Sequence, residues 1–143
     1  MRGARMVLGG ALVCAVAVAC GPSERDLSLR QLSLTYTYVI TPNVVPPVSG
    51  APIQYTVVIR DRDTRQPIQN GEGQIFAQHI DGPKTWDSFV YGPEVGTYHA
   101  TLHFVVSGDW AIAIRFRRDS LSPLERTDWH QDVLEGSDSA GGP

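Results

Sequence analysis

Residues 98–116 read YHATLHFVVSGDWAIAIRF, and this stretch decides the fold. Apolar side chains occupy alternate positions on both sides of Ser107-Gly108-Asp109, which is the period of a half-buried strand. Two such runs of similar length around a glycine-containing turn predict an antiparallel hairpin. The residues of the apolar face are Tyr98, Ala100, Leu102, Phe104, Trp110, Ile112, Ile114 and Phe116.

The same short period recurs upstream. Strands are expected at residues 32–40, 55–59, 74–80 and 86–91, separated by segments that contain proline or glycine. No segment shows a convincing helical period. About seven short strands at this spacing predict an all-β fold, an immunoglobulin-like antiparallel β-sandwich.

The first 19 residues have the features of a signal peptide. Arg2 and Arg5 precede residues 6–19, a run without charge that is rich in Val, Ala, Leu and Gly. Because a transmembrane helix needs roughly 20 apolar residues, a permanent membrane-spanning anchor is the weaker interpretation. The run ends in Ala17-Val18-Ala19-Cys20, which resembles the lipobox of bacterial lipoproteins. In that family the cysteine is acylated and begins the mature chain; the alternative is an ordinary signal peptide cleaved near Ala19, with Cys20 free.

Acylation at Cys20 implies an exported protein held at a membrane surface, since several acyl chains anchor stably. Gly21 after the cysteine indicates the outer membrane, facing the periplasm, if the organism has one. The expected organisation is a signal peptide at 1–19, a lipidated tether at 20–30, the sandwich at 31–127 and an acidic, disordered tail at 128–143.

Behind the signal the chain is acidic. Residues 1–19 hold two of the 12 basic residues and none of the 15 acidic ones, so the remaining chain carries a net charge of −5. Such a domain is a poor candidate for nucleic-acid binding. Attachment to anionic lipid is therefore expected from the acyl chains rather than from a polybasic patch. The charged segment 60–65 is interpreted as a solvated turn, and the alternative is a docking patch.

Three motifs point to a family: residues 55–59 with Pro67-Ile68 after them, residues 96–100, and residues 107–114. Together they resemble the YtkA-like, or FixH-like, immunoglobulin-fold domains of bacterial envelope proteins, over roughly residues 50–118. The resemblance implies the sandwich fold and an accessory role in the periplasm, in some members near respiratory oxidases or copper handling. The motif residues are structural ones: Gly96, Tyr98, Gly108 and Trp110.

For function, the sequence favours a non-enzymatic module, without a cofactor, that binds another envelope protein. Catalytic motifs such as Gly-x-Ser-x-Gly, His-Glu-x-x-His and a phosphate loop are absent. A hydrolase, whose catalytic residues meet only in the fold, is the third hypothesis. Trp86 and Trp129 lie outside the strong alternation, and one of them is a candidate exposed binding aromatic.

The second hypothesis is a domain that handles copper or another metal through its histidines. The sandwich has no methionine and no free cysteine, so a copper or zinc site would consist of imidazole and carboxylate groups. His99 and His103 share one face of a strand, but their backbones are about 13 Å apart, so these two histidines cannot chelate one metal ion by themselves. The candidate ligands are His79, His99, His103 and His130, with Asp109 as a further donor.

Overall fold

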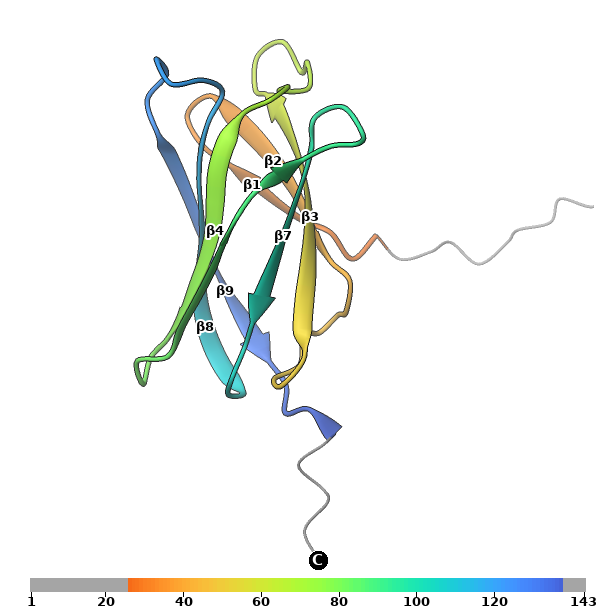
Figure 1. The fold of residues 1–143 in the computed structure, drawn as a ribbon, viewed down its shortest axis with the longest axis vertical. Coiled ribbons are helices and arrows are strands. Elements are labelled where there is room, and N and C mark those ends of the chain that lie inside the picture. Colours follow the sequence, from red (N-terminus) through yellow and green to blue (C-terminus); the bar gives the residue numbers. More distant parts are fainter. Residues whose placement is uncertain (1–25, 138–143) are drawn as a thin grey trace, which may run out of the picture.

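The computed structural model describes residues 26–137, which form two antiparallel β-sheets packed face to face (Figure 1). Sheet orders are β1-β2-β3-β7-β6 and β5-β4-β8-β9. The predicted all-β sandwich is therefore confirmed. The strands of the described residues are β1 (Leu29–Leu32), β2 (Tyr36–Pro42), β3 (Pro52–Asp61), β4 (Glu72–His79), β5 (Lys84–Ser88), β6 (Val90–Tyr91), β7 (Thr97–His103), β8 (Gly108–Arg117) and β9 (Glu125–Val133).

The strand order is that of an immunoglobulin-like sandwich. If β2 to β9 are taken as strands A, B, C, C′, D, E, F and G, the sheets have the orders A-B-E-D and C′-C-F-G. β1 is an additional strand, paired with β2. The expected strand at 86–91 is two strands, because the chain passes from one sheet to the other at Phe89.

The predicted hairpin of residues 98–116 is wrong, since β7 and β8 do not pair. β7 lies between β3 and β6, whereas β8 lies between β4 and β9 in the opposite sheet. Both strands turn their apolar faces inward, and the rings of Phe104 and Trp110 meet edge to face with centroids 5.0 Å apart. The alternation thus identified the buried faces, but not which strands are hydrogen-bonded.

The N-terminal strand also differs from expectation. Residues 32–40 are not one strand but parts of a hairpin, in which the Ser33 N–H donates to the Tyr36 carbonyl at 2.9 Å. Leu34 lies in this turn and is 84% exposed. Its apolar side chain continued the alternation without being buried. β1 begins at Leu29, within the expected tether.

The C-terminal boundary of the sandwich was placed too early. β9 continues to Val133, past the expected start of the tail at residue 128, and both Trp129 and Val133 are buried. The signal peptide and Cys20 lie outside the described residues, as do residues 138–143 of the expected tail. The part of the chain that is described contains no helix of the length and apolarity needed to cross a membrane.

The core lies between the sheets, and all of its buried members fall between Tyr36 and Val133. Side-chain hydrogen bonds link the two sheets along both edges of the sandwich. The Asp87 carboxylate and the Thr85 hydroxyl accept backbone N–H groups of β7, and Glu125 accepts the N–H of Thr35 at 2.9 Å. Residues 26–137 thus contain both sheets and every buried residue of the core cluster, so we expect this segment to fold by itself.

Tyr98 ties the core to the loop before β4. Its hydroxyl donates to the Ile68 carbonyl at 2.7 Å and accepts the Gly71 N–H at 2.9 Å. We expect Tyr98→Phe to lower the free energy of unfolding by about 1–3 kcal/mol in urea denaturation, because both backbone groups lose their partner. Tyr55→Phe is the matched control, since the Tyr55 hydroxyl is buried without a hydrogen bond. Equal losses in the two variants would contradict this interpretation.

Candidate functional site

The outer face of the four-stranded sheet carries two aromatic residues, which lie opposite each other on neighbouring strands. On β4, Ile75 and Ala77 point into the core, so Phe76 points outward, where it lies opposite Trp86 of β5. Trp86 is 66% exposed, although tryptophan is usually buried over most of its surface. The residue opposite Phe76 on the other neighbouring strand is the small Ala113.

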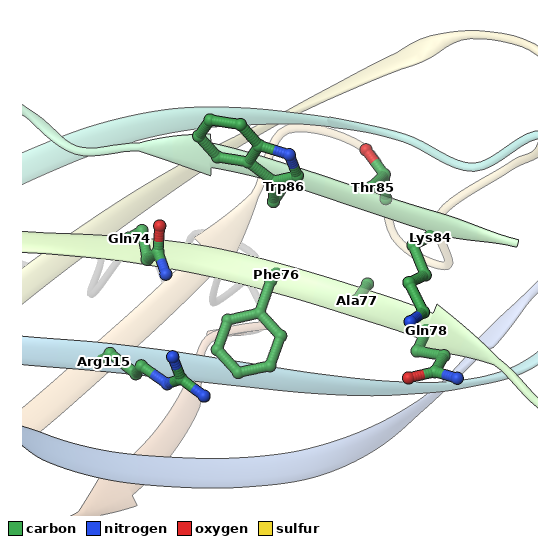
Figure 2. A pocket seen from close by; sticks show the side chains of 8 residues that line it. All are labelled: Gln74, Phe76, Ala77, Gln78, Lys84, Thr85, Trp86 and Arg115. Carbon is green, nitrogen blue, oxygen red and sulfur yellow. The ribbon is translucent and has the colours of Figure 1, made fainter.

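A hollow of about 380 Å³ opens on this face. We call it the Trp86 hollow. Figure 2 shows Trp86, Phe76 and Arg115 on three neighbouring strands, with the side chains of Lys84 and Gln78 together at one end. Its lining residues are Gln74, Phe76, Ala77, Gln78, Lys84, Thr85, Trp86 and Arg115.

The hollow combines aromatic rings with positive charge. The guanidinium carbons of Arg115 and Arg126 lie 5.0 and 5.1 Å from the centre of the Phe76 ring, within the range of cation–π attraction. Arg126 is also paired with Asp128 at 2.5 Å. Within residues 26–137, by contrast, neither Arg115 nor Lys84 has a carboxylate within salt-bridge distance. Both cations remain available to a ligand.

Several residue types of this hollow are those that are enriched in protein interfaces. Aromatic residues and arginine are enriched in interfaces, and tryptophan and arginine supply most of the residues whose truncation weakens binding strongly. Two glutamine side chains next to the rings add hydrogen-bonding groups. The face is therefore suited to a segment with an apolar side chain near carboxylates.

Sequence reasoning identified this site only in part. Trp86 was one of two candidate exposed aromatics; the other, Trp129, is 8% exposed and faces the core. Phe76 and Arg115 were not singled out. The available signal was the segment 74–78, in which a phenylalanine stands between two glutamines on the face opposite to Ile75 and Ala77.

The four histidines of the metal hypothesis do not gather at one place, although His79 and His130 line one hollow together with Asp109. His99 and His103 lie on the outer face of the five-stranded sheet, where the Nδ1 atom of His99 is 3.4 Å from the Thr56 hydroxyl. His130 lies on the outer face of β9, with Nδ1 2.9 Å from an Asp109 carboxylate oxygen. Residues 26–137 contain no group of three His, Cys, Asp or Glu side chains placed to hold a metal ion. Within the described residues the four histidines therefore do not form one metal centre.

His79 differs from the other three because it is buried. Its ring packs against Trp110 with centroids 5.3 Å apart, and its Nδ1 atom accepts the Asp81 N–H. A Cβ at Gly108 would lie 2.8 Å from its Nε2 atom, and Gly108 also has a φ of 119°. Gly108 therefore makes room for the imidazole. Copper or zinc binding at any histidine stays a prediction.

The fold places the chain among immunoglobulin-like β-sandwich domains. Among solved structures it is similar to the crystal structure of a DUF4426 family protein from Pseudomonas aeruginosa PAO1, with a TM-score of 0.58 and 13% identity over 75% of this chain and 94% of that chain. At this identity the likeness supports the β-sandwich fold alone. No protein-family model matches the chain, and no curated protein matches it either. The YtkA-like or FixH-like resemblance stays a prediction.

Proposed function

We propose that this chain is a non-enzymatic accessory lipoprotein of the bacterial envelope, anchored through Cys20, whose sandwich binds another envelope protein at the Trp86 hollow. The observation that supports this proposal is an exposed Trp86 opposite Phe76, in one hollow with Arg115, which has no carboxylate partner within residues 26–137. The resemblance of residues 50–118 to YtkA-like and FixH-like domains supports the accessory role, because that family context implies it.

The partner presents an apolar side chain flanked by carboxylates. The apolar group fits against Trp86 and Phe76, and the carboxylates pair with Arg115 and Lys84, which lie in the same hollow. Within residues 26–137, the outer face of the other sheet carries no exposed tyrosine, tryptophan or phenylalanine. There all the tyrosines point into the core or its margin: Tyr36, Tyr38, Tyr55, Tyr91 and Tyr98.

Photo-crosslinking in intact cells tests this proposal. A photoreactive amino acid replaces Gln78 on the rim of the hollow or, as the control, Thr56 on the outer face of the opposite sheet. We expect one discrete protein crosslink from position 78, lost in a Trp86→Ala background, and none from position 56. Mass spectrometry then identifies the partner. The same crosslink from both positions, or none from position 78, would contradict the proposal.

A further inference from the structure

The structure brings together four arginines from two separate parts of the chain. Arg30 lies on β1, and Arg60, Arg62 and Arg65 lie at the end of β3 and in the turn that follows it. β2 runs between these strands, with Thr37 opposite both Leu32 and Arg60. The four side chains line a hollow of about 450 Å³, which we call the arginine hollow. Its other lining residues are Gln31, Leu32, Thr37, Tyr38 and Val39.

The guanidinium groups of the arginine hollow are available to an anion. Arg60 donates to the Arg65 carbonyl and Arg62 to the Ser33 carbonyl, each at 3.3 Å, which orients both side chains. In the described chain none of Arg60, Arg62 and Arg65 has a carboxylate within salt-bridge distance. Of the two aspartates between them, Asp61 pairs with Arg118, and Asp63 makes no ion pair within residues 26–137. Arg30 makes only an exposed pair with Asp26 at 3.7 Å, and such pairs are weak.

Exposed leucines lie on β1 and on either side of it in the chain. Leu27, Leu32 and Leu34 are 56%, 57% and 84% exposed, and Leu32 itself lines the arginine hollow. Guanidinium groups bind phosphate oxygens bidentately, and leucine side chains enter the boundary between headgroups and acyl chains. This combination fits a phospholipid surface better than a soluble anion, which would not cover the leucines.

The position of the arginine hollow in the chain also favours a phospholipid surface as its ligand. Cys20 precedes Arg30 by ten residues, which span at most roughly 36 Å when fully extended. An anchor at Cys20 therefore keeps Arg30 and the first strand within this distance of the membrane. The turn after β3 lies at the end of the sandwich opposite to the end at which β9 finishes (Figure 1).

We infer that the arginine hollow docks this domain on the anionic phospholipid surface of the membrane that holds Cys20. The arginines bind headgroup phosphates, and Leu27, Leu32 and Leu34 enter the interface. This inference rests on the lipoprotein part of the proposed function. It replaces the expectation that attachment depends on the acyl chains alone, because the fold adds Arg30 of β1 to the three arginines of the segment 60–65. The Trp86 hollow, on the opposite sheet, then faces away from the membrane.

Vesicle co-sedimentation of residues 26–137 tests the inference. We expect binding to phosphatidylglycerol vesicles at low ionic strength, none to phosphatidylcholine vesicles, and loss of binding as salt is raised. Arg60→Gln with Arg62→Gln should lower the partition coefficient about 30-fold, at about 1 kcal/mol for each arginine near the surface. The matched control is Arg117→Gln with Arg126→Gln, the same change of charge on the opposite sheet, which should stay within about threefold of the unaltered domain.

Three results would overturn membrane docking: no binding to phosphatidylglycerol, equal losses in the two double variants, or displacement by inorganic phosphate at constant ionic strength. The last would assign the hollow to a soluble phosphate. Equal urea midpoints exclude unfolding as the cause of any loss, since the substituted arginines of the hollow are exposed. The crosslinking test uses the opposite sheet, so failure of partner binding and failure of membrane docking are read separately.

Discussion

Trp110→Ala is expected to lower the free energy of unfolding by about 3–5 kcal/mol, the largest effect that we expect from a single substitution. Trp110 is fully buried between the sheets, where it packs against Phe104 and His79. Its indole N–H donates to the Val106 carbonyl at 3.1 Å. Because domains of this size have a total stability of about 5–15 kcal/mol, the variant loses a large part of it.

Trp86→Ala is the control for this prediction in the same urea denaturation. Trp86 projects from the outer face, and an exposed substitution of this kind changes stability by less than about 0.5 kcal/mol. Comparable losses in the two variants would mean that Trp86 is a packing residue. Trp86 would then not be an exposed binding residue of the outer face.

Trp86→Ala should instead weaken binding of the crosslinked partner by at least about 30-fold, corresponding to the roughly 2 kcal/mol of a strong interface residue. The indole lies on β5, opposite Phe76 of the neighbouring strand, and is 66% exposed, so its removal takes exposed apolar surface from the hollow. Isothermal titration calorimetry with the purified partner and residues 26–137 measures the change.

Val90→Ala is the matched control for binding, because Val90 is 67% exposed but belongs to the other sheet. Its affinity should equal that of the unaltered domain. If Val90→Ala and Trp86→Ala weakened binding equally, the partner would not be recognised by the outer face of the four-stranded sheet. A further Arg115→Gln variant reports on the carboxylates of the partner, and its effect should diminish with salt.

The two hollows give the domain two opposed surfaces. The arginine hollow lies on the five-stranded sheet, near the point where the tether joins β1, and the Trp86 hollow lies on the other sheet. In our proposal the first surface lies on the membrane and the second receives the partner. Membrane docking therefore orients the domain, which shortens the search between two proteins held at the same surface.

The fold class was predictable because burial imposes a period of two on each strand. Alternation in residues 98–116 correctly placed Tyr98 and Trp110 on inward faces. Strand pairing was not predictable from this alternation. β7 and β8 both have an apolar inner face and similar lengths, but each is hydrogen-bonded to other strands. Leu34 shows the converse error, because an apolar residue in a turn continues a strand pattern without being buried.

Both candidate surfaces depend on contacts that the linear sequence does not record. Arg30 and Arg60 are 30 positions apart and approach only because β1 and β3 flank β2. Arg115 reaches Phe76 because β8 pairs with β4. The sequence left open whether Trp86 or Trp129 is the exposed tryptophan. The structure separates the two, because Trp129 lies opposite Ile112 on the inner face of the sheet.

Partner binding at the Trp86 hollow is tested most directly by NMR. The three indole N–H signals of ¹⁵N-labelled residues 26–137 are followed while the identified partner is added. The tryptophans sample different surroundings: Trp86 on the outer face, Trp110 in the core and Trp129 on the inner side of β9. We predict a saturable shift of the Trp86 signal, with those of Trp110 and Trp129 unchanged. Saturating binding that leaves the Trp86 signal in place would contradict the account.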